Sequence, residues 1–310
     1  MTLLQFDRLT VSVSGRPVLR QVTLDVAAGE AVGLVGESGS GKSMTVRSVM
    51  RLLPAGATVG GTVRFDGADV GALDATGLRR MRSRDVAMVF QDPRAVVNPV
   101  RTVGDFLTEV LRDQGTGRSE ATARAAAALS EVGVGDAMRR LQQRPYELSG
   151  GLLQRVVIAA ALLTGPRLIL ADEPTTALDT TTQEEVVAIL AEQRRLRGTT
   201  LMFITHDLEL AAAVCDRIAV MYAGEIVEIL PAARLHSDAR HPYTRALLGS
   251  RPGAVAPGER LRTVPGVPQS ALTAPPGCVF ADRCPHAEAR CRDVRPVFTG
   301  SAACHLLEVL

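Results

Sequence analysis

The feature that most constrains this chain is the octapeptide GESGSGKS at residues 36–43, which fits the pattern G-x-x-x-x-G-K-[ST]. The apolar stretch AVGLV precedes it, and a stretch that reads as a helix follows it as far as Pro54. Glycines let successive backbone N–H groups point inward around phosphate oxygens, and the helix start adds the positive end of its dipole. The sequence therefore predicts an α/β fold with a phosphate-binding loop of the Walker A type.

Each residue of this loop has an expected role in holding a nucleotide. Lys42 would reach the β- and γ-phosphates, and the Ser43 hydroxyl would bind Mg²⁺. The rest of the loop would surround the phosphates: Gly36, Glu37, Ser38, Gly39, Ser40 and Gly41. A Gly/Ser loop that matches by chance is the alternative, and the flanking strand and helix argue against it.

A second apolar stretch, RLILADEP at residues 167–174, ends in two adjacent carboxylates. Asp172 would orient Mg²⁺, and Glu173 would polarise the attacking water as general base. Buried strands that end in surface acids are common, so the pair gains its weight from the Walker A loop before it. The two motifs predict hydrolysis of a nucleoside triphosphate.

Further motifs indicate which nucleotide machine this is. ELSGGLLQR at residues 147–155 resembles the signature motif of ATP-binding cassette (ABC) proteins, and an apolar helical stretch follows it. In the same order as in that family, Gln91 resembles the Q-loop, Asp179 the D-loop and His206 the switch histidine. The resemblance covers roughly residues 3–230.

The resemblance implies a P-loop NTPase cassette with a RecA-like core, an antiparallel β subdomain and a helical subdomain. The cassette would span residues 1–235, with the helical subdomain at about 92–163. Gln91 would contact Mg²⁺, and Gln91 and His206 would act in catalysis as sensors of the γ-phosphate. The signature and the D-loop would contact the nucleotide of a partner cassette through Ser149, Gly150, Gly151 and Asp179.

The C-terminal part narrows the class of transporter. HPYT at residues 241–244, a Pro/Gly-rich run from Arg251 to Gly277 and a cysteine-bearing end resemble the tail of oligopeptide/dipeptide importer ATPases. This implies a small Cys-rich C-terminal domain at residues 236–310 and a role in energising the import of di- and oligopeptides. The alternatives are an importer of nickel or another small solute and a soluble, non-transport ABC ATPase.

Four of the five cysteines lie in this tail, and Cys215 reads as an ordinary core cysteine. Structural zinc usually shows C-x₂₋₄-C pairs, which are missing here. Related importer ATPases are associated with a 4Fe–4S cluster, for which longer spacings are acceptable. We therefore expect a 4Fe–4S cluster, with Zn²⁺ as the alternative and His286 or His305 as possible replacement ligands. The expected ligands are Cys278, Cys284, Cys291 and Cys304.

Charge and hydropathy bound the partners and the location. The net charge is +2 and the basic residues, almost all of them Arg, are scattered along the chain, so no nucleic-acid partner is expected. No signal peptide is evident, and no apolar run approaches the about 20 residues of a membrane span. The resemblance implies a second ABC ATPase (a different chain), two integral-membrane permease subunits and an extracytoplasmic solute-binding protein. The chain would then lie peripherally on the cytoplasmic face of the bacterial inner membrane.

Overall fold

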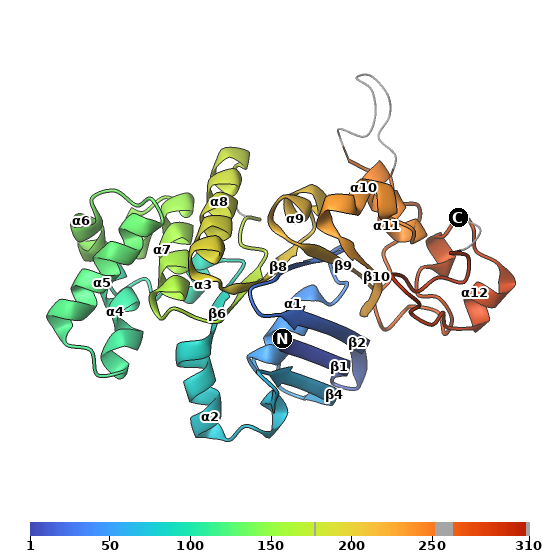
Figure 1. Ribbon diagram of the computed structural model, residues 1–310, viewed down its shortest axis with the longest axis horizontal. Coiled ribbons are helices and arrows are strands. Elements are labelled where there is room, and N and C mark those ends of the chain that lie inside the picture. Colours follow the sequence, from blue (N-terminus) through green and yellow to red (C-terminus); the bar gives the residue numbers. More distant parts are fainter. Residues whose placement is uncertain (177, 252–262, 308–310) are drawn as a thin grey trace. The chain divides into compact units, whose positions relative to one another are not determined.

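The structure, a computed structural model, describes residues 1–176, 178–251 and 263–307 (Figure 1). The chain forms two compact units, Met1–Ala72 with Phe203–Leu310, and Leu73–Met202, which we describe separately. No helix in these described ranges has the length and apolar character needed to cross a membrane.

The first unit begins with an antiparallel sheet in the order β2-β1-β4-β5. Its strands are β1 (Thr2–Val13), β2 (Arg16–Ala27), β4 (Ala57–Phe65) and β5 (Ala68–Asp69). Ser14 and Gly15 join β1 to β2 with φ of 51° and 75°, the left-handed pair that matches the twist of a tight hairpin.

The same unit contains a buried strand that leads into the Walker A loop. Strand β3 (Ala31–Val35) is buried at every residue, pairs in parallel with β9 (Arg217–Tyr222), and is followed after the loop by α1 (Lys42–Val49). Helix α9 (Leu208–Val214) packs closely, because a Cβ on Gly33 would lie 3.1 Å from that of Ala211. The predicted strand is confirmed.

The helix after the loop is shorter than the sequence indicated. Helix α1 ends at Val49, and Arg51, at φ 49°, has left the helical region before Pro54. The helix ends in a Schellman-type cap, in which Leu52 N–H donates to the Arg47 carbonyl at 2.9 Å and Arg51 N–H to the Ser48 carbonyl at 3.1 Å.

The C-terminal tail packs against the last strand pair of this unit. Strand β10 (Glu225–Pro231) runs antiparallel to β9 through a turn at Ala223 and Gly224. Residues 301–303 lie along β10: Ile229 N–H donates to the Ser301 carbonyl (2.7 Å), and Ala303 N–H to the Val227 carbonyl (2.8 Å). The tail helices are α10 (Leu235–Asp238), α11 (Pro242–Gly249) and α12 (Ala289–Asp293).

Aromatic side chains join the tail to β9. Tyr222, Tyr243 and Phe280 are buried, with ring centroids 4.6–5.3 Å apart. Two of the chain's three tyrosines lie in this one cluster. The tail therefore shares a core with the strands before it, and the division into 1–235 and 236–310 stays a prediction.

The second unit is mainly helical around a parallel strand pair. Strand β6 (Val86–Val89) pairs with β7 (Leu168–Asp172), which confirms the strand predicted before Asp172 and Glu173. Its helices are α2 (Ala75–Arg80), α3 (Pro93–Val96), α4 (Val103–Asp113), α5 (Arg118–Glu131), α6 (Ala137–Gln142), α7 (Gly150–Leu163) and α8 (Thr180–Arg197). Gly133, at φ 73°, follows α5 and ends it in the left-handed conformation that glycine favours. Strand β8 (Thr200–Thr205) then leads the chain back into the first unit.

Truncation of Phe280 tests the shared core. Phe280→Ala removes a buried ring between Tyr222 and Tyr243, and should lower the free energy of unfolding by about 3–5 kcal/mol. Chemical denaturation followed by tyrosine fluorescence measures this loss. Phe298→Ala, at a ring that is 39% exposed, is the matched control and should change little. Equal effects of the two variants would argue against a shared core.

Candidate functional site

Close backbone approaches fix the loop at residues 36–43 in the first unit. A Cβ at Gly36 would lie 2.0 Å from the Met221 carbonyl oxygen, so no side chain fits there. Gly41 has φ 103°, and its Cβ would meet Leu19 Cδ2 at 2.6 Å. The carbonyl of Ser40 accepts a hydrogen bond from Gly224 N–H at 2.9 Å. The loop therefore rests on β2 and on the β9–β10 turn.

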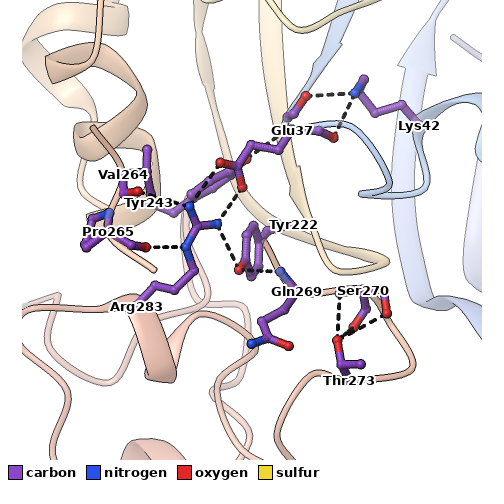
Figure 2. A network of polar contacts seen from close by, with 11 residues as sticks. Glu37, Lys42, Tyr222, Tyr243, Val264, Pro265, Gln269, Ser270, Thr273 and Arg283 are labelled. Carbon is purple, nitrogen blue, oxygen red and sulfur yellow. Dashed lines mark hydrogen bonds and ion pairs between the residues drawn. The ribbon is translucent and has the colours of Figure 1, made fainter. Parts of the chain in front are cut away.

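Lys42 lies within this loop with its amine on backbone oxygens. Its Nζ donates to the carbonyls of Gly36 at 2.7 Å and Glu37 at 3.1 Å (Figure 2). The Ser40 hydroxyl is buried without a hydrogen-bond partner in the part of the chain that the structure describes. A buried amine, an unused hydroxyl and a helix N-terminus are the donors that a phosphate group requires, so the loop fits the predicted ligand.

The tail contacts the same loop, which the sequence did not indicate. Arg283 donates from Nη1 to Glu37 Oε2 at 2.6 Å and from Nη2 to Oε1 at 3.1 Å. Glu37 N–H donates to the Tyr243 hydroxyl at 2.9 Å. Figure 2 shows these residues around the start of the loop, together with Tyr222, whose hydroxyl accepts from Arg283 at 3.1 Å.

In the second unit, the predicted base and the Q-loop residue lie together. Gln91 Nε2 donates to Glu173 Oε2 at 3.3 Å, and Thr176 Oγ1 donates to the same oxygen at 2.9 Å. Glu173 has φ 48°, a left-handed backbone conformation that costs energy for a residue with a side chain. Asp172, next to it at the end of β7, is almost fully buried. The two hydrogen bonds hold the Glu173 carboxylate in one orientation.

The signature and D-loop residues cap two helices of the second unit. Ser149 Oγ accepts from Leu152 N–H at 3.3 Å at the start of α7, where Gly150 and Gly151 form the first turn. Asp179 starts α8 and accepts from Thr182 N–H at 3.0 Å and from Thr182 Oγ1 at 2.8 Å. These two bonds lower the pKa of Asp179, so it is ionised at neutral pH.

Close packing joins the two caps. A Cβ at Gly151 would lie 2.7 Å from Thr182 Cγ2, which leaves no room for a larger residue. The structure therefore brings the signature turn and the D-loop cap side by side.

His206 belongs to the first unit, directly after β8, and its side chain is exposed. Asp207 N–H donates to Thr205 Oγ1 at 3.0 Å, and Asp207 then caps α9 by accepting from Glu209 and Leu210. This tight connection between strand and helix presents the histidine ring at the end of the strand.

The four tail cysteines line one pocket. Cys278, Cys284, Cys291 and Cys304 surround it together with His241 and His305, whereas His286 and Cys215 do not line it. Cys278 N–H donates to the Cys291 carbonyl at 2.7 Å, which sets these two residues side by side. Burial, and to a smaller extent the neighbouring thiols, raises the pKa of Cys278 to about 12. Burial also raises the pKa of Cys284 and Cys304.

The pocket nevertheless has no formed ligand set. Across residues 1–176, 178–251 and 263–307, no three His, Cys, Asp or Glu side chains are arranged to hold a metal ion. The four tail cysteines lie together, as their clustering in the sequence indicated. The expected 4Fe–4S or Zn²⁺ ligation, however, is not supported by their positions. The donor set still suits either metal, because thiols are what both bind.

Comparisons with known families agree with the two parts of the sequence analysis. The family described as ABC transporter matches residues 19–176. The family described as oligopeptide/dipeptide transporter, C-terminal region, matches residues 227–291.

Curated relatives match over most of their length. A probable peptide ABC transporter ATP-binding protein of Sinorhizobium fredii is 44% identical over 90% of this chain and 84% of its own. The oligopeptide transport ATP-binding protein OppD of Escherichia coli is 41% identical over 90% of this chain and 83% of its own. The dipeptide transport ATP-binding protein DppD of Bacillus subtilis is 42% identical over 90% and 84%.

Solved structures show the same fold. A dimeric ATP-binding cassette in a post-hydrolysis state, bound to ADP and phosphate, has a TM-score of 0.67 and 30% identity, over 74% of this chain and 99% of that one. A cassette of a Clostridium perfringens ABC transporter complex has a TM-score of 0.67 at 24% identity, over 76% of this chain and 91% of that one.

A methyl group at Gly41 tests the loop. Gly41→Ala puts a side chain at φ 103° and against Leu19, so the loop must distort. Its dissociation constant for Mg·ADP, measured by isothermal titration calorimetry, should rise about tenfold or more. Gly249→Ala, where a Cβ meets nothing within 4 Å, is the control and should bind as the parent does. Unchanged affinity in Gly41→Ala would contradict the assigned loop.

Proposed function

Because the chain belongs to the ABC transporter family, whose cassettes are ATPases, we propose that it is the ATP-hydrolysing subunit of a bacterial importer of di- and oligopeptides. The observation that carries the cargo class is the match of residues 227–291 to the oligopeptide/dipeptide transporter C-terminal region. The peptide-transport names of the relatives support it. None of these names favours nickel or a soluble, non-transport role.

The proposed hydrolysis divides between two groups of residues. Residues 36–43 bind the phosphates of ATP, with Lys42 neutralising charge on the β- and γ-phosphates. Glu173 accepts a proton from the attacking water, and its hydrogen bonds from Gln91 and Thr176 hold the carboxylate for that task. His206 contacts the γ-phosphate and senses its presence.

Three residues are proposed to hold Mg²⁺. Ser43 supplies a hydroxyl, Asp172 a carboxylate and Gln91 an amide oxygen, which are the oxygen ligands that Mg²⁺ prefers. The bound ion supplies positive charge that offsets the charge on the transferring phosphoryl group.

The signature turn and Asp179 are proposed to face a second cassette. Ser149 to Gly151 present backbone N–H groups at the start of α7, which is a suitable place for the γ-phosphate of a nucleotide held by a partner. The proposed partners are a second ABC ATPase of different sequence, two membrane permease subunits and an extracytoplasmic solute-binding protein. The complex would place this chain on the cytoplasmic face of the inner membrane, and no nucleic acid takes part.

Glu173→Gln tests the proposed base. The amide cannot accept the proton, so ATP turnover by the assembled importer, followed by phosphate release, should fall about 100-fold or more. Mg·ATP should still bind, because Glu173 lies outside the phosphate-binding loop. Glu131→Gln, at an exposed ion pair with Arg197, is the control. Normal turnover by Glu173→Gln would refute the role of Glu173.

We also propose that the tail pocket binds a metal centre through its four cysteines, 4Fe–4S before Zn²⁺. The support is that all four line one pocket with a thiol donor set. Binding would deprotonate the thiols and draw their sulfur atoms into a common ligand shell, in the way metals complete small folded units.

Metal analysis of the anaerobically purified chain tests this proposal. Cys284→Ser with Cys291→Ser should lose the bound iron or zinc. Cys215→Ser, which removes a buried thiol outside the pocket, should retain it. A parent chain without either metal would overturn the proposal, and a double variant that keeps its metal would overturn the ligand assignment.

A further inference from the structure

We propose that Arg283 is a positioning residue for nucleotide binding, which acts by holding Glu37 of the phosphate-binding loop. The inference rests on the proposed role of residues 36–43 as the phosphate site. It assigns to the C-terminal tail a function at that site, separate from any metal that the tail holds.

Glu37 connects the tail to the loop through three different groups. Its carboxylate receives both Nη donors of Arg283, its N–H donates to the Tyr243 hydroxyl, and its carbonyl accepts from Lys42 Nζ. The second residue of the loop is therefore fixed on one side by the tail and on the other by the lysine assigned to the phosphates (Figure 2).

Arg283 is itself held rigidly before it reaches Glu37. Its side chain is only 3% exposed, its Nε donates to the Pro265 carbonyl at 2.6 Å, and its Nη1 donates to Tyr222. The guanidinium carbon lies 5.6 Å from the centroid of the Tyr222 ring and 5.9 Å from that of Phe280. A planar fork that pairs with a carboxylate and lies over aromatic rings is a geometry that lysine cannot reproduce.

Two physical effects of this contact act in the same direction on nucleotide affinity. A loop that is held in shape before binding loses less conformational freedom when the nucleotide arrives. The guanidinium also neutralises a carboxylate that belongs to a loop built for anions, and so removes a repulsion that the phosphates would otherwise meet. Loss of Arg283 should therefore weaken binding by both effects.

A tail that served only to complete the fold would behave differently. Replacing Arg283 would then lower stability, and neutralising Glu37 as well would not restore affinity. If Arg283 acts through Glu37, removal of the stranded carboxylate should recover part of the lost binding. This rescue is the readout that separates positioning from folding.

The first measurement is the dissociation constant of the full chain for Mg·ADP, by isothermal titration calorimetry. Arg283→Gln should raise it about tenfold, the factor expected for losing a charge-assisted pair of hydrogen bonds. Arg292→Gln is the matched control, because Arg292 lies in the same tail and pairs with Asp282 at the surface. It should bind as the parent does.

Further variants follow the path through Glu37. Glu37→Gln combined with Arg283→Gln should bind more tightly than Arg283→Gln alone and within about threefold of Glu37→Gln alone, since the two changes remove one interaction. Arg283→Lys keeps the charge and loses the fork, so its affinity should lie between the parent and Arg283→Gln. If Arg283→Gln does not fold, Tyr243→Phe, which removes the acceptor of Glu37 N–H, should still weaken binding severalfold.

The outcomes separate this inference from the proposed site. Lys42→Ala with unchanged affinity would overturn residues 36–43 as the phosphate site and this inference with it. Weak binding by Lys42→Ala, with parent-like binding by Arg283→Gln, or by Tyr243→Phe where Arg283→Gln does not fold, would overturn only the positioning role. If the losses of affinity in Arg283→Gln and in Glu37→Gln add fully in the double variant, the path through Glu37 is overturned.

Discussion

The contact between Gly36 and the Met221 carbonyl is the constraint on which the phosphate-binding loop depends. A Cβ at Gly36 would lie 2.0 Å from that oxygen. Strand β3, which leads into the loop, and strand β9, which leads into the turn at Gly224, must therefore meet without a side chain between them. Gly224, in that turn, donates to Ser40 and accepts from Arg20 N–H at 2.8 Å. The loop is therefore built from backbone contacts, which leaves its remaining donors for a ligand.

The tail extends this arrangement. Tyr222 ends β9, packs against Tyr243 and Phe280, and accepts a hydrogen bond from Arg283. Strand β9 thus contacts the glycine-rich loop through Met221 and the tail through the next residue, Tyr222. Because Tyr222 belongs to the aromatic cluster and also accepts from Arg283, the tail packs directly against the glycine-rich loop.

The sequence predicted those features that depend on local pattern. The strand before the loop and the strand that ends at Asp172 could be located because apolar runs mark them directly. The predicted end of α1 at Pro54 is wrong, because the helix ends at Val49.

Long-range contacts explain what the sequence could not provide. Glu37 and Arg283 are 246 positions apart, and no periodicity in either segment indicates that they meet. The clustering of the cysteines was visible in their spacing, but the arrangement of their sulfur atoms depends on how residues 278–304 pack on β10. Glu37 looked like a variable position of a motif, and only the folded chain shows the ion pair that holds it.

The distance along the chain between Glu37 and Arg283 has a consequence for biosynthesis. The glycine-rich loop is made early, yet its contacts with Tyr243 and Arg283 cannot form until more than 200 further residues have been added. Such non-local contacts are the slow ones to close during folding. A nascent chain that has completed its antiparallel sheet therefore still lacks these contacts, so the loop is fully supported only near the end of translation.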